Sequence, residues 1–312
     1  MKRIILLFLL LASRNCGYTQ NKSLPKLQVE NLNFIIVSDM GQRGISEQQN
    51  IADIMGYFAE QNKINFMAVA GDPINDNGVK SVTDEEWKLK FENIYTSPSL
   101  QKLPFYIVSG NHEYYGSVQA ILDYSAVSER WNAPARYFSM ECTIDTSLQK
   151  VLFIYLDTSP FIDKYRESDK YSDIREQNIE QQLYWLDSIL VASTNKWKIV
   201  IGHHPVYANT DKAIKERTDM QTRVGEILEN RGADFYICGH IHNFQHIKPE
   251  NSKVHYVINS SASQSRKVEP IEGTIFCNAD PGYSVFTIST DSVGFFFVNH
   301  LGETVYEYTI EK

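Results

Sequence analysis

Short apolar runs alternate with amphipathic stretches over the first three quarters of the chain. Each apolar run has the length of a buried strand and ends in glycine or polar residues. These runs lie at Phe34–Val37, Phe66–Ala70, Phe105–Val108, Val151–Leu156, Lys198–Ile201 and Phe235–Cys238. Between them, apolar residues at helical spacing or capping residues predict helices over Ser46–Glu60, Thr83–Tyr95, Gln177–Ala192 and Arg223–Asn230. This alternation predicts an α/β layered domain.

Helical spacing disappears in the last part of the chain. Four further apolar runs predict successive strands at Val254–Ile258, Tyr283–Ile288, Phe295–Val298 and Thr304–Ile310. No linker or internal repeat separates this tail from the alternating part. We therefore expect one catalytic-sized domain over residues 25–312.

The N-terminus has the pattern of an export signal. Lys2 and Arg3 precede the apolar run Ile4–Ala12, which is too short to cross a bilayer as a helix. The pattern predicts a signal peptide over residues 1–19 and a periplasmic or secreted protein. A buried N-terminal strand is the alternative for the apolar run, and a lipid anchor on Cys16 is the alternative for the processed end.

Composition and charge exclude several classes of protein. The 312 residues are 43% hydrophobic, which is too much for a disordered chain. The net charge of −8 argues against a nucleic-acid-binding surface with a dominating positive field. Past the export signal, Cys142, Cys238 and Cys277 fit no zinc-finger or redox spacing, so we expect them to pack as small apolar side chains. We expect no transmembrane segment, and the oligomeric state stays open.

Polar side chains of metal-binding types follow the apolar strands. They are Asp39, Asp72, Asn111, His203, His240 and His242. Because the carboxyl ends of strands in an α/β sheet meet at one crevice, these groups are expected to converge. Carboxylate, amide oxygen and imidazole are ligands for divalent metals, and a metal pair also needs a bridging carboxylate, a role that suits Asp72. Each residue alone has a plainer interpretation, such as a helix cap or a core histidine, but the ordered set predicts a metal site.

Five segments carry a resemblance to a known family. They are Val37-Ser38-Asp39-Met40-Gly41, Ala70-Gly71-Asp72, Val108-Ser109-Gly110-Asn111-His112-Glu113, Gly202-His203-His204-Pro205-Val206 and Cys238-Gly239-His240-Ile241-His242-Asn243. The chain resembles the calcineurin-like metallophosphoesterases, and among them the small purple, or tartrate-resistant, acid phosphatases. The resemblance runs from Phe34 to the C-terminus. It implies an αββα sandwich, in which two packed mixed sheets are flanked by helices and a dinuclear metal site lies at the C-terminal ends of the strands.

The resemblance also implies a role for each matching residue. One metal would be held by Asp39, Asp72 and His242. The other would be held by Asp72, Asn111, His203 and His240, with Asp72 bridging the two. His112 matches the histidine that contacts the phosphate and protonates the leaving group, while water activated by the metals attacks phosphorus.

Three positions depart from the family pattern. Purple acid phosphatases have a metal-binding tyrosine where this chain has Asn75, and many other metallophosphoesterases have a histidine where it has Gly41. Asn75 would coordinate the first metal through its amide oxygen, or water would fill that place. We therefore expect a non-purple centre with Zn, Mn or Fe. Lys212 stands near the position of a second substrate-facing histidine, for which His204 either substitutes or serves only in packing.

The resulting hypothesis is an exported hydrolase of small phosphomonoesters. A phosphodiesterase or nucleotide hydrolase on the same site is one alternative. A non-catalytic metal- or phosphate-binding protein with an eroded first metal site is another. Substrate choice is expected to depend on residues 78–82, 116–136 and 161–174.

Overall fold

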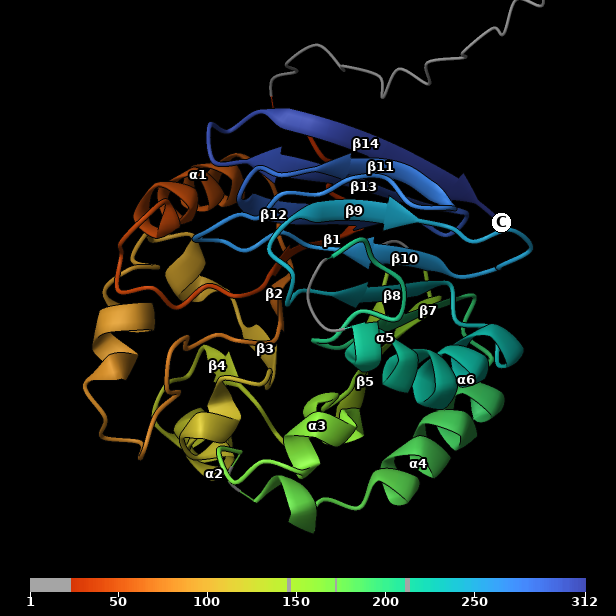
Figure 1. The fold of residues 1–312 in the computed structure, drawn as a ribbon. Coiled ribbons are helices and arrows are strands. Elements are labelled where there is room, and N and C mark those ends of the chain that lie inside the picture. The colour runs from red at the N-terminus through yellow and green to blue at the C-terminus, as the bar shows by residue number, and fades with distance from the viewer. Residues whose placement is uncertain (1–23, 145–146, 172, 211–213) are drawn as a thin grey trace, which may run out of the picture.

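The computed structural model describes residues 24–144, 147–171, 173–210 and 214–312. The predicted export signal, Cys16 and Lys212 lie outside these residues. Two seven-stranded sheets pack face to face, and helices cover their outer faces (Figure 1). The predicted α/β sandwich of two mixed sheets is confirmed.

The first sheet combines the N-terminal alternating part with the C-terminal tail. Its order is β14-β13-β12-β1-β2-β3-β4. The bounds are β1 (Leu32–Val37), β2 (Phe66–Ala70), β3 (Phe105–Val108), β4 (Trp131–Asn132), β12 (Gly282–Ile288), β13 (Ser292–Asn299) and β14 (Thr304–Glu311). Strands β1 to β4 run parallel, and β12 pairs antiparallel with β1. The tail thus extends the sheet that the first strands begin.

The second sheet contains the strands from the middle of the chain. Its order is β11-β9-β10-β8-β7-β6-β5. The bounds are β5 (Phe138–Thr143), β6 (Lys150–Tyr155), β7 (Trp197–Ile201), β8 (Phe235–Cys238), β9 (Phe244–Ile247), β10 (His255–Ile258) and β11 (Thr274–Asn278). The central strands β6, β7, β8 and β10 run parallel, so their carboxyl ends point the same way.

In the residues that the structure describes, six α-helices and several short turns connect the strands. The α-helices are α1 (Gln48–Gln61), α2 (Val118–Asp123), α3 (Asp163–Arg166), α4 (Ile179–Ala192), α5 (Ile214–Met220) and α6 (Glu226–Asn230). The 3₁₀ turns are Leu100–Lys102, Glu113–Tyr115, Tyr124–Ala126, Ser159–Phe161 and Ile174–Glu176, and π-helical turns lie at Lys88–Glu92 and Gln221–Gly225. Within the described ranges, none of these helices is long and apolar enough to cross a membrane.

Three apolar layers hold the sandwich together. Between the sheets, Phe34 of β1 stacks on Phe66 with ring centroids 4.9 Å apart and meets the edge of Phe153 from the other sheet at 5.2 Å. On the outer face of the first sheet, Met55 of α1 joins the second layer. On the outer face of the other sheet, Leu186 of α4 joins the third. Because the parallel strands are buried on both faces, their sequences are continuous apolar runs.

Two predicted helices differ from the structure. The helix expected over Thr83–Tyr95 is shorter in the structure, where residues 86–92 are helical and Lys88–Glu92 form a π-helix. Lys90 is buried there, and its ammonium group contacts Glu86 in the same helix and Asp76 in the loop after β2. The helix expected at Arg223–Asn230 is the end of a longer helical segment that includes α5.

Candidate metal centre

The predicted metal ligands lie at the carboxyl ends of strands from both sheets. Asp39 follows β1 and Asp72 follows β2, whereas His203 follows β7 and His240 follows β8. A direct contact joins the two sheets here, because the backbone N–H of His240 donates to Asp39 Oδ2 at 2.9 Å. The hydroxyl of Ser261 donates to the carbonyl of Asp39 at 2.8 Å. The strand ends therefore converge as the sequence predicted.

Backbone strain is concentrated at this convergence. Asp39, Asp72, His240 and His242 all have positive φ angles, between 49° and 73°. Residues with a side chain rarely adopt this left-handed region, and they keep it where surrounding contacts enforce it, often at functional sites. Gly71 lies beside them for a steric reason, because a Cβ there would approach His203 Nδ1 to 2.3 Å.

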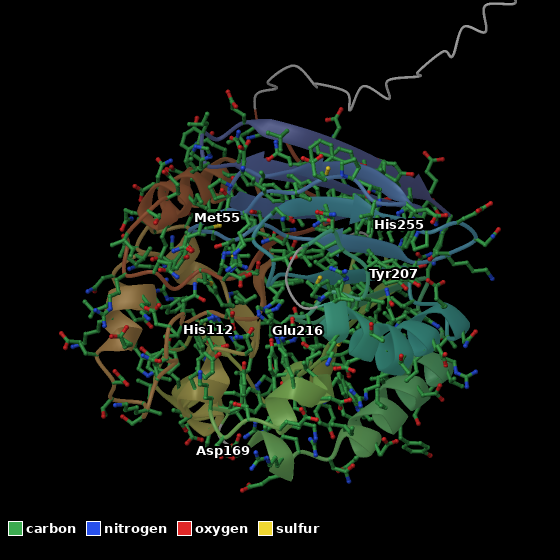
Figure 2. The ribbon with its side chains drawn as sticks, in the orientation of Figure 1. Met55, His112, Asp169, Tyr207, Glu216 and His255 are labelled. Carbon is green, nitrogen blue, oxygen red and sulfur yellow. The ribbon has the colours of Figure 1, made fainter. Side chains whose placement is uncertain are left out.

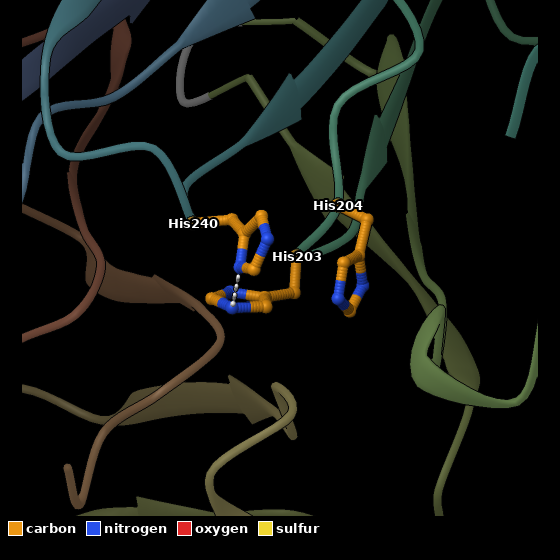
Figure 3. A group of neighbouring side chains, drawn as sticks. All are labelled: His203, His204 and His240. Atoms are coloured by element: carbon orange, nitrogen blue, oxygen red, sulfur yellow. Dashed lines mark hydrogen bonds between the residues drawn. The ribbon is translucent and has the colours of Figure 1, made fainter. Parts of the chain in front are cut away.

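His203 is at the centre of the second predicted site. Its Nε2 lies 3.2 Å from Asp72 Oδ2. The same atom lies 3.2 Å from His240 Nδ1, a contact that Figure 3 shows as a dashed line. The Nδ1–H of His203 donates to the carbonyl of Ala70 at 2.9 Å, so Nε2 is the atom that faces the site. His203 Nε2 thus lies close to a carboxylate oxygen and to a second imidazole nitrogen, which are ligand types for a divalent cation.

The first predicted site is built on Asp39 and His242. Asp39 is fully buried, and its Oδ1 lies 3.1 Å from His242 Nε2. Asp39, Asp72 and His203 offer ligand atoms that lie within 4.8 Å of one another. The described side chains therefore bring residues of both predicted sites close to Asp72.

Asn111 provides a second observation in favour of bound cations. Its side chain is 6% exposed, and its Oδ1 is buried without a hydrogen-bond partner in the described part of the chain. A buried amide oxygen without a partner costs free energy unless something satisfies it. A metal ion at the site predicted from sequence would satisfy this oxygen.

The charges around Asp72 also fit a cation site. Burial acts to raise the pKa of Asp72, but attraction to His203 and His112 holds it well below its usual value. Burial acts to lower the pKa of His203, but attraction to Asp72 and their hydrogen bond raise it to about 10. Positive charge is thus favoured between the two side chains. Metal binding here would replace the proton on His203.

The first predicted site has Gly41 and Asn75 at the two positions where related proteins have a metal-binding histidine or tyrosine. A Cβ at Gly41 would lie 2.3 Å from the carbonyl oxygen of Pro73 and 2.7 Å from Ile74 Cα. The histidine that many related sites have at this position therefore has no room here. Asn75 is 3% exposed, and its Nδ2 has no partner among the residues described. Coordination by Asn75 Oδ1 stays a prediction.

His112 lies beside the metal ligands with part of its ring accessible. Its backbone N–H donates to Asp72 Oδ1 at 3.0 Å, and its Nε2 lies 3.7 Å from Asp72 Oδ2. Its Nδ1–H donates to the carbonyl of Asp76 at 2.7 Å, which orients the ring. The side chain is 33% exposed. Nε2 therefore lies beside the site on a ring that is partly open to solvent, as a group that contacts substrate requires.

His204 has a different environment. It is fully buried, its Nδ1 accepts a hydrogen bond from the hydroxyl of Thr158 at 2.8 Å, and its Nε2–H donates to Tyr165 at 3.2 Å. Burial, together with the neighbouring His240, holds the pKa of His204 well below its usual value. A contact between His204 and substrate would require this hydrogen-bond network to open.

Two buried carboxylates at the site had no role assigned from sequence. Glu113 accepts from the backbone N–H of Ile74 at 3.1 Å and of Gly110 at 2.7 Å, and so ties together the loops after β2 and β3. Burial and the nearby Asp72 raise its pKa to about 8. Glu216 contacts His240 from the outside of the centre. Glu113 belongs to one of the five motif segments, so the sequence could have indicated it. Glu216 belongs to none of them.

Comparison with known proteins gives the family. A profile of the calcineurin-like phosphoesterase family matches residues 32–244. The chain belongs to this family. It is therefore a metallophosphoesterase, of a family whose members depend on a dinuclear metal centre and hydrolyse phosphate esters.

Relatives among characterised proteins are acid phosphatases. The chain is 33% identical over 263 residues to purple acid phosphatase 4 of Arabidopsis thaliana. The aligned residues cover 77% of this chain and 74% of that protein. It is 29% identical over 241 residues to tartrate-resistant acid phosphatase type 5 of Oryctolagus cuniculus, covering 74% of this chain and 73% of that protein. The resemblance to this branch of the family is confirmed.

Solved structures share the fold at lower identity. GAP50, described as the anchor in the inner membrane complex of Plasmodium, superposes with a TM-score of 0.76 at 21% identity, covering 90% of this chain and 89% of that one. Purple acid phosphatase PPD1 of yellow lupin superposes with a TM-score of 0.62 at 15% identity, covering 93% and 55%. These likenesses show the fold alone.

Proposed function

We propose that this metallophosphoesterase is an exported phosphatase that hydrolyses small phosphomonoesters. The observation that carries the proposal is the position of His112, whose Nε2 lies 3.7 Å from Asp72 Oδ2 on an accessible side of the site. A proton on this nitrogen is within reach of an ester oxygen bound beside Asp72. The similarity to acid phosphatases supports the same reaction.

Each residue of the site has a proposed role in this reaction. Asp39, Asp72, Asn111, His203, His240 and His242 would hold two cations, and Asn75 is a further candidate ligand. The cations would be Zn, Mn or Fe, and they would activate water and neutralise charge on the phosphoryl oxygens. His112 would give its proton to the leaving oxygen as the bond from that oxygen to phosphorus breaks, while the water oxygen stays on phosphorus. The hydrogen bond from His112 to Asp76 holds the ring in position for this transfer.

Two other functions remain as outcomes of the test. The same residues would support hydrolysis of phosphodiesters or nucleotides. A non-catalytic metal- or phosphate-binding protein is favoured by one observation, the close packing at Gly41, which leaves the first site without a histidine there.

The test combines elemental analysis with kinetics. The purified chain is expected to hold two transition metals and to hydrolyse phosphomonoesters faster than phosphodiesters. His112→Ala should lower kcat by roughly 10² to 10⁴ with the metal content unchanged. His300→Ala, in the turn between β13 and β14, serves as the control. Faster diester hydrolysis would favour the first alternative, and a chain holding at most one metal in excess Zn²⁺ or Mn²⁺ would favour the binding protein.

A further inference from the structure

Glu216 is a buried carboxylate that contacts His240, a ligand of the proposed second metal site, at the ring nitrogen that does not face His203. It lies on α5, is 2% exposed, and is labelled close to the middle of the molecule in Figure 2. Its Oε2 lies 2.9 Å from His240 Nε2. A carboxylate hydrogen-bonded to the outer nitrogen of a metal-ligating histidine fixes the ring orientation and makes the ligand more basic.

This contact determines which nitrogen of His240 carries the proton. An ionised carboxylate only accepts hydrogen bonds, so Nε2–H of His240 is the donor to Glu216. The lone pair of the neutral ring is then on Nδ1. That atom lies 3.2 Å from His203 Nε2, which is the side on which the cation would bind. Glu216 thus leaves His240 in the tautomer that a metal ligand needs.

The other oxygen of Glu216 fastens it to a second part of the fold. Oε1 accepts from the hydroxyl of Tyr165 at 2.6 Å, and Tyr165 in turn accepts from His204 Nε2–H at 3.2 Å. His204 is held at its other nitrogen by Thr158, which follows β6. Hydrogen bonds therefore run from the end of β6 to Glu216, which also accepts from His240, and these contacts fix Glu216 in one position.

Lys164 supplies the charge that makes a buried carboxylate tolerable. Its ammonium group forms an ion pair with Glu216. Lys164 and Tyr165 belong to α3, within the segment 161–174 that the sequence predicts to govern substrate choice. Glu216 therefore joins this segment directly to a metal ligand.

We propose that Glu216 is the positioning residue of the second metal site. It holds His240 with Nε2 protonated and Nδ1 directed at the cation. The inference rests on the proposed dinuclear centre and adds to it a residue that no family motif contains. Without this carboxylate, the cation held by His240 should bind about 10- to 100-fold more weakly.

Metal titration of the full chain tests this proposal. After removal of metals, Zn²⁺ is titrated into wild type, Glu216→Gln and the control Glu226→Gln, whose carboxylate is exposed on α6. We expect Glu216→Gln to weaken one of two sites by about 10- to 100-fold and the control to match wild type. Two sites of wild-type affinity in Glu216→Gln would overturn this inference alone. A wild type that binds fewer than two cations would overturn the proposed function and this inference with it.

A second measurement does not require Glu216→Gln to fold. In the zinc-loaded wild type with ¹⁵N-labelled histidine, the ring of His240 is expected to carry its proton on Nε2, and His240→Asn identifies its signals. Zinc bound through Nδ1 with a proton on Nε2 supports the proposal. A proton on Nδ1 would overturn it even where Glu216→Gln does not fold.

Discussion

Asn75 donates its backbone N–H to the carbonyl of Gly41 at 3.2 Å, and this contact shapes the first metal site. It holds the loop after β2 against the residue two positions past Asp39. From the other side, the buried ammonium group of Lys90 donates to the carbonyl of Asn75. The loop is therefore fixed in the space that a side chain at position 41 would need.

Gly41→Ala should destabilise the protein by about 2 kcal/mol or more, because the added Cβ meets backbone atoms of Pro73 and Ile74 that cannot move independently. The measurement is the free energy of unfolding in urea. Gly232→Ala is the control, because nothing lies within 4 Å of a Cβ there and only its positive φ of 69° opposes the side chain, a cost of about 1 kcal/mol. Equal losses in the two variants would show that the contact at Gly41 is easily relieved.

Substitution of Asn75 tests whether its amide oxygen coordinates the first metal. If it does, Asn75→Ala should weaken one metal site by about tenfold or more, and Asn75→Asp should strengthen the same site because a carboxylate binds cations more tightly than an amide. Titration of Zn²⁺ into the metal-free chain reports both changes. Asn77→Ala, at an exposed position of the same loop, is the matched control. Unchanged affinity in both Asn75 variants would mean that water fills this place.

The sequence predicted that the candidate ligands lie at strand ends, because each belongs to a local pattern. An apolar run identifies a buried strand, and the residue type directly after it identifies the chemistry, as with Asp72 after β2 or His203 after β7. Convergence then follows from the geometry of parallel strands. The same reasoning explains why the core of the fold was predictable, since strands buried on both faces have a strong signal.

The remaining features depend on contacts between distant segments. Glu216 gains its role only because α5 packs beside the end of β8, 24 residues away from His240 along the chain. The helix around Lys90 is shorter than predicted and contains a π-helical turn, and the contact of Lys90 with Asp76 joins it to the loop after β2. Strand β5 is half-exposed at a sheet edge, so its residues lack the continuous apolar run that marked other strands. Local periodicity contains none of this information.

Glu113→Gln should lower the free energy of unfolding by about 1–3 kcal/mol. With its pKa raised to about 8, Glu113 is neutral at pH 7, and each of its two oxygens faces one backbone N–H, from Ile74 and Gly110. A glutamine would place its NH₂ group, which cannot accept, against one of these donors. A buried N–H then loses its partner, and the loops that carry Asp72 and Asn111 are no longer tied together. Urea unfolding gives the energy, with the exposed Glu129→Gln as control. Equal stability of Glu113→Gln and wild type would contradict this account of the loops.

A pair of buried histidines, His246 and His255, lies away from the metal centre between the sheets. Lys248 Nζ lies 3.4 Å from His255 Nε2, and His255 Nδ1 lies 2.8 Å from His246 Nε2. His246 Nδ1 is 2.7 Å from the hydroxyl of Tyr306. Because lysine can only donate, the protons of this chain point from Lys248 toward Tyr306 and both rings are neutral. Burial, followed by His255 and Lys248, lowers the pKa of His246 to about 3, and burial together with Lys248 lowers the pKa of His255 to about 4.

These histidines should make the fold less stable in acid. Above the pKa of a histidine in the unfolded chain, about 6.5, neither the folded nor the unfolded state binds the proton, and the fold has its full stability. Below this pKa the unfolded chain binds the proton and the folded chain does not, so the fold becomes less stable. For His246 the loss reaches about 2 kcal/mol at pH 5. In metal-free protein, the free energy of unfolding should depend less steeply on pH in His246→Gln than in wild type between about pH 6 and 4. The difference in slope should correspond to at most one bound proton. Tyr306→Phe, which removes a hydrogen bond but no histidine, should keep the wild-type slope, and the same slope in His246→Gln would refute this origin of acid sensitivity.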